Sequence, residues 1–338
     1  MHAQPMATGN YVSSGHYQSF STVLTDMIRE KANSTGTLAL DAALGTGGFT
    51  FWRMVEISGD TGTGKTTLAL HAVAACQQQG GVAAFFDPEF ALDLSYARKL
   101  GVDVSSLLFS QPKTAEQTFD TAETLIKSGT VRVLVIDSIA ALLPKSHLFA
   151  PTTGTDTSAL EHSRILADGF CKLRIALRET KCTVIFTNQL RMKQVTATEF
   201  EATSIGGRPV ANFMATRVRL LHGNDIRCRG RVTGHHCEMS VTKHKDGKSG
   251  GRGSTPIIYQ SGMALSYETL VTGIRTGLVQ RNSSGFYALG HRLGATGIQA
   301  KLLLDKKPTL RIMINTKLLN ASFVLQRGSE NQENQRNN

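Results

Sequence analysis

Residues 59–66 of the chain are GDTGTGKT, which matches the pattern G-x-x-x-x-G-K-[ST]. An apolar run, Met54–Ser58, comes directly before this octapeptide, and a helical pattern, Lys65–Gln79, follows. Glycines at these spacings let backbone N–H groups surround phosphate oxygens, and a helix N-terminus favours an anion. We expect an ATP site in which Lys65 reaches the β- and γ-phosphates and Thr66 binds Mg²⁺. The expected nucleotide contacts are Gly59, Asp60, Thr61, Gly62, Thr63, Gly64, Lys65, Thr66 and Thr67.

A second apolar run, Val131–Asp137, ends in a carboxylate. An aspartate at the end of a buried strand costs free energy unless it serves a cation or a hydrogen-bond network. Many strands end in aspartate, so the motif is weak alone and gains weight only beside a phosphate site. Asp137 is predicted to hold the Mg²⁺ ion through water.

Hydrolysis of a nucleotide also needs a group that polarises the attacking water. Glu89 follows the apolar run Ala83–Asp87, at the carboxyl end of the expected strand, where open α/β sheets bind ligands. Asp87 is the alternative, but it lies closer to the buried run. Glu89 could instead cap a helix or form an ion pair. Glu89 is the predicted water activator.

Residues 36–225 alternate short apolar runs with helical patterns. A further run, Thr183–Thr187, is β-branched and aromatic, and the helical patterns Thr114–Ser128 and Ser158–Glu179 lie between runs. Runs that are apolar throughout predict strands buried on both faces, as in a parallel sheet wrapped by helices. The predicted fold class is therefore α/β, with a central, mostly parallel twisted sheet.

Four units are expected along the chain. Residues 1–35 carry an apolar helical stripe that either folds onto its own domain or packs on a neighbouring subunit. Residues 36–270 would form the ATPase core, and residues 271–325 a small α+β C-terminal domain. Residues 326–338 contain mainly Asn, Gln, Glu and Arg, a composition typical of a disordered tail.

The net charge of +11 is unevenly distributed. Residues 1–140 hold 9 Lys/Arg and 13 Asp/Glu, whereas residues 141–338 hold 28 and 13. An excess of basic side chains in one part of a chain indicates a polyanionic partner such as nucleic acid.

The five cysteines contain no CxxC pair, which is typical of free thiols in a reducing cytoplasm. Cys228 and Cys237, with His235 and His236, match no usual zinc spacing. The apolar runs are shorter than the ~18 residues of a membrane span, and no secretory signal is recognisable. We expect a cytoplasmic protein without a membrane partner.

Beyond these motifs, the sequence resembles the bacterial RecA family of DNA recombinases over roughly residues 34–310. The resemblance is carried by Thr37–Asp41, Leu44–Gly48, Phe86–Asp93, Tyr96–Asp103, Ser110–Pro112, Val135–Leu142 and Thr187–Lys193. Together these segments are far more specific than a phosphate loop alone. They identify the chain as a divergent member of this family, with a RecA-type ATPase core.

The resemblance implies roles for matching residues. Tyr96 would stack on adenine with Asp93 near the base, and Gln189 would sense the γ-phosphate. Lys243 and Lys245 would reach the ATP of the neighbouring subunit, so that the site lies between protomers. The implied catalytic set is Glu89, Lys65, Gln189, Lys243 and Lys245. The implied DNA contacts are Arg164, behind a first loop at residues 150–160, and Arg191, Met192, Lys193, Gly206, Gly207 and Arg208 in a mobile second loop. The helix in residues 17–32 would dock on the next protomer.

The residues themselves support part of this. Residues 194–207 are polar, lack helical periodicity and end in two glycines, which predicts a long irregular loop of functional type rather than a merely solvated one. Lys243 and Lys245 alternate on an expected strand and so share one face, although such a pair is often just a solvated face. Tyr96, taken alone, would be an ordinary core residue.

Several segments depart from the family pattern. The first loop is rich in Thr, and Gln194 stands in the second loop where the family has an apolar residue that wedges between bases. Residues Gly247–Gly253 differ from the family, and the tail is not acidic. These departures concern DNA engagement and its regulation rather than ATP chemistry.

The resemblance implies an ATP-dependent recombinase for DNA repair, which forms a homo-oligomeric helical filament on single-stranded DNA and pairs it with homologous duplex DNA. Hydrolysis of ATP, stimulated by DNA and assisted by Mg²⁺, would release the filament. One alternative is a paralogue that regulates recombination without exchanging strands, which loss of Glu89 or of the two lysines would favour. Another is a hexameric helicase, which would lack the Tyr96–Asp103 segment.

Overall fold

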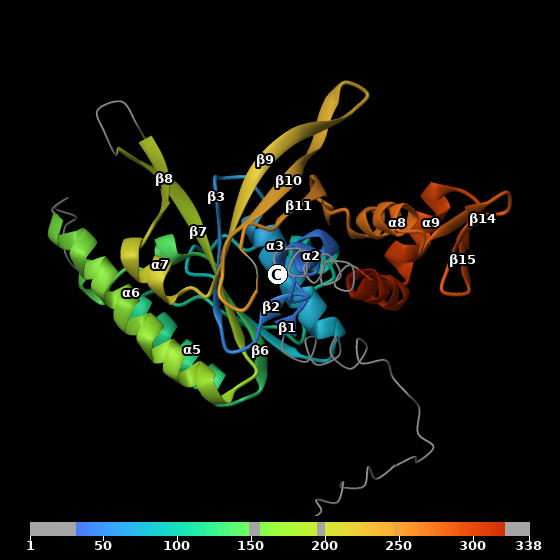
Figure 1. The fold of residues 1–338 in the computed structure, drawn as a ribbon. Helices are drawn as coiled ribbons and strands as arrows, with labels where there is room; N and C mark the ends of the chain where they lie inside the picture. Colours follow the sequence, from blue (N-terminus) through green and yellow to red (C-terminus); the bar gives the residue numbers. More distant parts are fainter. Residues whose placement is uncertain (1–31, 149–155, 195–199, 248, 322–338) are drawn as a thin grey trace, which may run out of the picture.

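The computed structural model describes residues 32–148, 156–194, 200–247 and 249–321 (Figure 1). The tail, most of the first loop and nearly all of the N-terminal arm, with its apolar stripe, lie outside the described residues. The predicted end of the arm, residue 35, lies beyond the first described strand. Ala32–Asn33 form a strand of the core, and Asn33 Nδ2 donates to Thr183 Oγ1 at 3.1 Å.

One large sheet forms the centre of the molecule. The large sheet contains β3 (Met54–Gly59), β4 (Val82–Phe86), β5 (Leu108–Ser110), β6 (Val131–Ile136), β7 (Thr183–Gln194), β8 (Phe200–Ser204), β9 (Thr216–Cys228), β10 (Arg231–His244), β11 (Arg252–Ile258) and β12 (Gly262–Met263). Two small sheets are formed by β1 (Ala32–Asn33) with β2 (Phe49–Thr50), and by β13 (Gln280–Asn282), β14 (Gly285–Ala288) and β15 (His291–Gly294). The sheet order is β12-β11-β10-β9-β3-β7-β6-β4-β5. The strands from β9 to β5 in this order run parallel, and β10 to β12 are antiparallel. The predicted α/β class with a mostly parallel sheet is confirmed.

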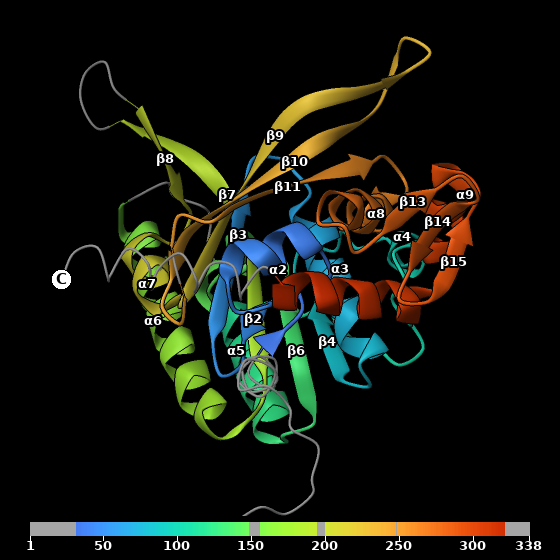
Figure 2. The ribbon, with the colours of Figure 1, turned by 45° about the vertical axis from the view of Figure 1, so that its right-hand side comes forward.

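Helices cover both faces of this sheet (Figures 1 and 2). They are α2 (Leu38–Leu44), α3 (Lys65–Gln78), α4 (Leu94–Lys99), α5 (Ala115–Lys127), α6 (Asp156–Ala176), α7 (Gly207–Phe213), α8 (Leu265–Arg275) and α9 (Gly297–Lys306). One core lies between the sheet and α2, α3 and α4, and a second lies between the sheet and α5, α6 and α7. Strand β3 is buried along its whole length, because it has a layer of helices on each side.

Two hairpins extend beyond the helical layers (Figure 1). One is formed by β7 and β8, which pair antiparallel from Leu190↔Ser204 to Gln194↔Phe200. The other is formed by β9 and β10. The irregular loop predicted at residues 194–207 is therefore wrong in large part, because its second half is a strand that pairs with an extended β7 and leads into α7.

A small unit at the C-terminal end has its own core, built from α8, the sheet β13–β14–β15, α9 and the helical residues 308–321 (Figure 2). It begins with α8 at Leu265, six residues before the predicted boundary. Glu268 of α8 reaches back to the start of α2, where its carboxylate accepts hydrogen bonds from the backbone N–H groups of Leu38 at 3.1 Å and Ala39 at 2.6 Å. No described helix is both long and apolar enough to cross a bilayer.

Candidate functional site

A cleft of about 440 Å³ opens at the carboxyl edge of the parallel strands. The turns that follow β3, β4 and β6 meet there, at the edge where open α/β sheets bind ligands. Its lining comprises Thr61, Gly62, Gly64, Lys65, Thr66, Thr67, Glu89, Tyr96, Asp137, Ser138, Gln189, His235, Ile257, Tyr259 and Gln260. Most side chains singled out from the sequence for nucleotide chemistry thus gather in one place.

A larger cleft, of about 890 Å³, lies between α2, β11 and α8. Its lining contains Glu268, but that carboxylate is already bonded to the start of α2. The remaining lining is mostly glycine, alanine and other apolar residues, with Arg252 and Arg275 as its strongest charges. The larger cleft lacks a cluster of reactive groups, so the smaller one is the candidate site.

The phosphate loop holds Lys65 directly over its own backbone. Lys65 Nζ donates to the carbonyl oxygens of Gly59 at 3.0 Å and Asp60 at 2.8 Å. Gly64 has φ 97°, a left-handed conformation that glycine adopts without steric cost. A Cβ on Gly64 would also lie 2.4 Å from Ile257 Cδ1. Burial lowers the pKa of Lys65, whereas the carboxylates of Asp137 and Glu89 act in the opposite direction.

Asp137 joins the loop to two neighbouring strands. Its Oδ2 accepts a hydrogen bond from Thr66 Oγ1 at 2.6 Å, and its Oδ1 accepts one from the Thr187 hydroxyl. Burial raises the pKa of Asp137, and these two hydrogen bonds partly offset the effect. A hydroxyl and a carboxylate side by side provide the oxygen ligands that Mg²⁺ prefers, so the side chains present fit this ion.

The two carboxylates after β4 have different surroundings. Glu89 is exposed in the cleft, and the Ser138 hydroxyl donates to its Oε1. Asp87 is buried, and its oxygens accept from the backbone N–H groups of Ala91 and Leu92, each at 3.1 Å. Asp87 therefore stabilises the turn, while Glu89 remains available to a ligand.

Tyr96 lines the cleft beside the first turn of α3. Its hydroxyl lies 3.0 Å from Thr67 Oγ1, with either atom able to donate. Asp93 caps helix α4, because its Oδ1 accepts from the backbone N–H groups of Ser95 at 2.7 Å and Tyr96 at 3.1 Å. Asp93 does not line the cleft. Its described contacts fix the start of the helix that carries Tyr96.

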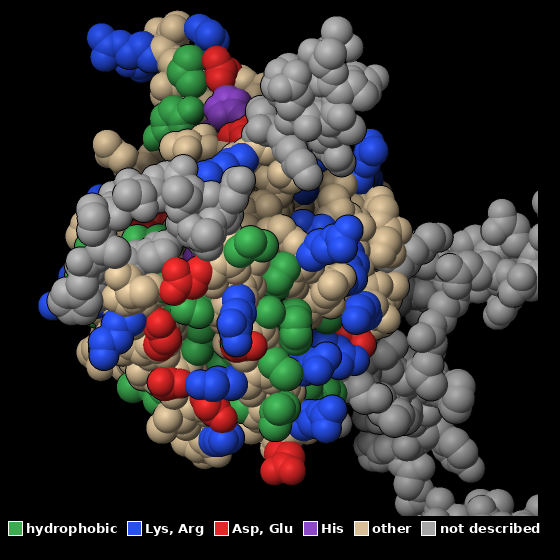
Figure 3. All heavy atoms as spheres, turned by 90° about the vertical axis from the view of Figure 1, so that its left-hand side faces the viewer, with side chains coloured by type: hydrophobic (Ala, Val, Ile, Leu, Met, Phe, Trp, Pro, Cys, Tyr) green, Lys and Arg blue, Asp and Glu red, His purple; other side chains and the backbone are tan. Residues whose placement is uncertain are grey.

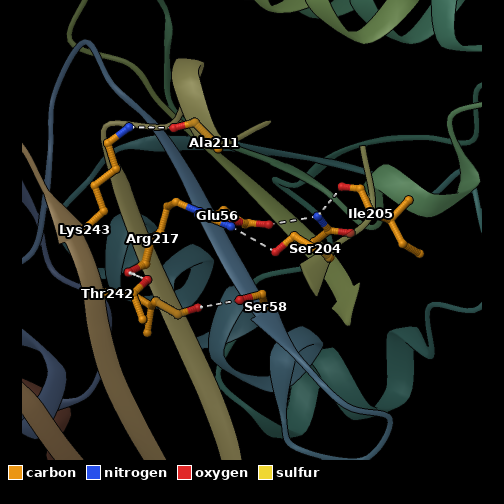
Figure 4. Close-up of polar contacts among 10 residues, drawn as sticks. Glu56, Ser58, Ser204, Ile205, Ala211, Arg217, Thr242 and Lys243 are labelled. Atoms are coloured by element: carbon orange, nitrogen blue, oxygen red, sulfur yellow. Dashed lines mark hydrogen bonds and ion pairs between the residues drawn. The ribbon is translucent and has the colours of Figure 1, made fainter. Parts of the chain in front are cut away.

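Figure 4 shows a polar network behind the cleft, centred on Glu56 of β3. This carboxylate is fully buried, and it accepts from Asn188 Nδ2 at 2.8 Å and from Arg217 Nε at 2.5 Å. Asn188 Nδ2 also donates to the carbonyl of Ile205 at 2.8 Å, and Arg217 donates to Ser204 Oγ at 3.0 Å. The strand before the phosphate loop is thereby bonded to the base of the β7–β8 hairpin.

The predicted DNA contacts lie on or beside this hairpin. Met192 and Lys193 fall on β7, opposite Ala202 and Glu201 of β8, and Arg191 precedes them. Gly206 and Gly207 begin α7 with φ 88° and 58°, and Arg208 is exposed there. A Cβ on Gly206 would lie 2.8 Å from Leu166 Cδ1 of α6. Arg164 is exposed on α6.

The prediction that Lys243 and Lys245 share a strand is wrong for the second residue. β10 ends at His244, and Lys245 lies in a bend, although its backbone N–H still bonds the carbonyl of Ala215 at 3.0 Å. Lys243 Nζ donates to the Ala211 carbonyl of α7 at 2.7 Å (Figure 4). Neither lysine lines the cleft that holds the phosphate loop of the same chain.

The tip of the β9–β10 hairpin is strongly basic. Arg227, Arg229 and Arg231 are all exposed there, and among the described side chains only Arg227 of the three pairs with a carboxylate, that of Asp225 at 3.2 Å. On the face over α5 and α6, by contrast, acidic and basic side chains are mixed (Figure 3). The described cysteines are free, and the described residues contain no cluster of three metal-binding side chains.

A family model described as the RecA N-terminal domain matches residues 22–264, more than half of the chain. The chain belongs to the RecA family. Protein RecA of Ruegeria pomeroyi is 38% identical over 288 residues, which cover 85% of this chain and 82% of that protein. Protein RecA of Bartonella henselae is 38% identical over 305 residues, covering 88% and 87%. Protein RecA of Azospirillum lipoferum is 37% identical over 300 residues, covering 88% and 83%.

Membership of the RecA family and the RecA-type α/β core are thus confirmed. Besides Ser138, which lies next to the predicted Asp137, four residues of the cleft were not assigned to the site from the sequence: His235, Ile257, Tyr259 and Gln260. These four come from β10, from β11 and from the turn after it, far along the chain from the phosphate loop. No motif marks them, and only the pairing of these strands against the rest of the RecA-family sheet brings them to the cleft.

Proposed function

We propose that this RecA-family recombinase is a DNA-dependent ATPase that forms helical filaments on single-stranded DNA and exchanges strands with a homologous duplex. One observation carries the proposal. Gln189 of β7 lines the cleft with Lys65 and Glu89, and the same strand continues to Gln194 as one side of the projecting hairpin. A change at the γ-phosphate therefore has a direct route, along one strand, to the expected DNA contacts.

The chemistry follows from the side chains of the cleft. Lys65 places positive charge over the loop that would hold the phosphates, which stabilises charge developing in the transition state. Bound Mg²⁺, held at Thr66 and Asp137, would neutralise charge on the β- and γ-phosphates. Glu89, oriented by Ser138, would accept a proton from the attacking water. Tyr96 and the exposed ring of Tyr259 offer flat surfaces to the base.

DNA binding would rest on phosphate contacts. Arg191 and Lys193 lie on the β7–β8 hairpin and Arg208 follows it, and Gly207, which has open space where a Cβ would be, leaves room for close backbone approach. Such contacts do not read sequence, which suits a protein in which pairing between strands supplies the specificity. Single-stranded DNA and a homologous duplex are the proposed partners.

A second copy of the chain would complete the site. Lys243 and Lys245 lie outside the cleft of their own chain, which supports a role for them at the nucleotide of a neighbouring protomer. The proposed units are the N-terminal arm, which would dock on the next protomer, the ATPase core, the C-terminal unit and the tail.

The first test is Lys65→Ala. Loss of the ammonium should lower DNA-stimulated ATP turnover at least ~100-fold and weaken ATP-dependent DNA binding, because nothing else in the loop supplies that charge. Steady-state ATPase and DNA-binding titrations measure both effects. Lys127→Ala, on the exposed end of α5, is the matched control and should behave like the wild type. Retained turnover in Lys65→Ala would place the reaction elsewhere.

A second test separates recombination from regulation. Electron microscopy with single-stranded DNA and a slowly hydrolysed ATP analogue should show helical filaments, and a strand-exchange assay should yield product. Rings would indicate a helicase-like motor. Filaments without any exchange product would indicate a regulatory paralogue.

A further inference from the structure

His235 forms part of the cleft wall that faces the phosphate loop. It lies in β10, where its Cα partner across the sheet is Ile257 of β11. Its side chain is 1% exposed, and both residues line the cleft together with Tyr259. The imidazole is thus packed against protein while it borders the space that a bound nucleotide would fill.

Neither ring nitrogen of His235 has a hydrogen-bond partner among the described residues. The carbonyl of Thr63 lies near enough to favour the protonated ring electrostatically, but no hydrogen bond of normal geometry joins the two. Buried polar side chains are nearly always hydrogen-bonded in folded proteins. A buried donor or acceptor without a partner destabilises the protein, so a ligand that supplied a partner would bind more tightly.

The ring is held in a fixed orientation. It stacks on His222 with a centroid distance of 4.0 Å and an interplanar angle of 15°, and Tyr259 lies 5.8 Å away at 50°. Burial, followed by the charge of His222, lowers the pKa of His235 below its ordinary value. The ring is therefore neutral at pH 7 and presents one N–H donor and one nitrogen acceptor.

The position of the ring within the cleft limits which part of a nucleotide it meets. Lys65 and the N-terminus of α3 mark the end that receives phosphates. The two tyrosines of the lining, Tyr96 and Tyr259, offer flat faces to a base, and the ring of His235 lies 5.8 Å from that of Tyr259, which places the nucleoside beside His235. A phosphate offers acceptors only, whereas a nucleoside offers both donors and acceptors, which match the two nitrogens of a neutral imidazole.

We propose that His235 hydrogen-bonds the nucleoside of the bound nucleotide, through a ribose hydroxyl or the edge of the base, and thereby sets the nucleotide preference of the site. The inference rests on the proposed ATP site. His235 is then a binding residue for the nucleoside and takes no part in proton transfer. His222 acts through it, as the stacked ring that keeps His235 in place.

The decisive experiment measures binding of Mg-ADP and of pyrophosphate to the full chain by isothermal titration calorimetry. His235→Phe keeps a flat ring against His222 and removes both nitrogens. It should bind ADP about 3- to 10-fold more weakly, as expected for one lost hydrogen bond. Its affinity for pyrophosphate should equal that of the wild type, because pyrophosphate has no nucleoside.

His236→Phe is the matched control. It alters the next residue of β10, which points to the other face of the sheet and lines the larger cleft instead. Its affinity for ADP should be unchanged. His235→Gln restores a donor and an acceptor and should recover part of the lost affinity. If the phenylalanine variant does not fold, the affinities of His235→Gln and His235→Ala for ADP and for pyrophosphate are compared instead.

Nucleotide analogues identify the partner atom. If a ribose hydroxyl is the partner, 2′- or 3′-deoxy-ADP should bind the wild type 3- to 10-fold more weakly than ADP, and His235→Phe should not distinguish them. If the base edge is the partner, inosine diphosphate or 7-deaza-ADP should behave that way. Unchanged ADP affinity in His235→Phe, or an equal loss of pyrophosphate affinity, overturns the proposal. Failure of the wild type to bind ADP at all would instead refute the proposed ATP site.

Discussion

At the scale of single residues, the contrast between Glu89 and Asp87 shows how contacts separate two similar carboxylates. Asp87 is buried and bonded to the backbone of the following turn, whereas Glu89 faces the cleft beside Ser138. The sequence placed both near the end of one strand and favoured Glu89 by position alone. Only the hydrogen-bond partners of Asp87 explain why it is not free to activate water.

We predict that Glu89→Gln binds ATP and assembles on DNA but turns over at least ~100-fold more slowly, because the amide cannot accept a proton from water. Single-turnover hydrolysis and nucleotide titrations measure the two effects separately. Asp87→Asn should act differently, by loosening the turn and lowering thermal stability. A Glu89→Gln protein that no longer binds ATP would show that this side chain is structural.

The strand, loop and helix around the phosphate loop were predictable because the residues of the motif are contiguous and their spacing is fixed by the chemistry of a phosphate. His235 and Tyr259 were not, because each is an ordinary residue in its local sequence. Their place at the cleft depends on the register of β10 against β11, in which His235 pairs with Ile257. Register across a sheet follows from the pattern of buried side chains over many residues, and no short motif records it.

At the scale of elements, the β7–β8 hairpin corrects the expectation of an irregular loop. The absence of helical periodicity in residues 194–207 was read as absence of structure. The segment FEATS, residues 200–204, forms β8 and pairs with β7 beyond its predicted end at Thr187. Phe200 is the single large apolar residue of this segment, which is too little for hydrophobic patterning to predict a strand.

The network around Glu56 leads to a prediction about how this hairpin is anchored. Arg217→Met should lower the free energy of unfolding by about 3 kcal/mol, because it leaves the fully buried Glu56 carboxylate without its cation. Adding Glu56→Gln should restore much of the lost free energy of unfolding, since the amide oxygen still accepts a hydrogen bond from Asn188 and the side chain carries no charge. Urea unfolding of the two single variants and the double variant forms the cycle. Additive losses would mean that the two residues are not coupled.

The basic tip of the β9–β10 hairpin should contribute to DNA affinity. Replacing Arg227, Arg229 and Arg231 by Gln should weaken binding to single-stranded DNA at low salt. It should also make the slope of log affinity against log salt shallower by about 2, since each phosphate contact on a single strand adds ~0.7. Fluorescence anisotropy across a salt series measures the slope.

The control for that experiment replaces Lys127, Lys172 and Arg178, which are exposed on or next to α5 and α6, where charges are mixed. The slope should then stay close to that of the wild type. An unchanged slope in the hairpin variant would exclude the tip from the DNA interface. A strong preference for one duplex motif over random single strands would contradict phosphate-based binding altogether.

At the scale of the whole molecule, the sheet and its two helical layers were predictable because buried parallel strands have continuous apolar runs. The boundaries between units were not. The core begins at least as early as Ala32, and the C-terminal unit begins at Leu265. Both boundaries lie where polar side chains of one segment bond another, as Asn33 does with Thr183, and such contacts leave no signal in composition.

The proposal that two protomers share the active site is tested by mixing two defective proteins. Lys243→Ala with Lys245→Ala should leave the chain folded and able to bind ATP, because both lysines lie outside its own cleft. It should abolish the part of ATP turnover that DNA stimulates. Mixed with Lys65→Ala protein, it should regain part of that turnover, since some interfaces then pair an intact phosphate loop with intact lysines. No recovery despite co-assembly would place the lysines on DNA or in their own chain.

Glu268 has a consequence for modularity. Its carboxylate accepts from the Thr37 hydroxyl and from the first backbone N–H groups of α2, and it also accepts from Thr255 at 2.8 Å. A helix N-terminus needs acceptors for these N–H groups, and here the acceptor is supplied from more than 200 residues away in the chain. The core and the C-terminal unit are therefore not interchangeable parts. A chimera joined just before α8 would take Glu268 from one relative and the start of α2 from another, although each depends on the other. Grafts between relatives must therefore carry Glu268 and its hydrogen-bond partners together.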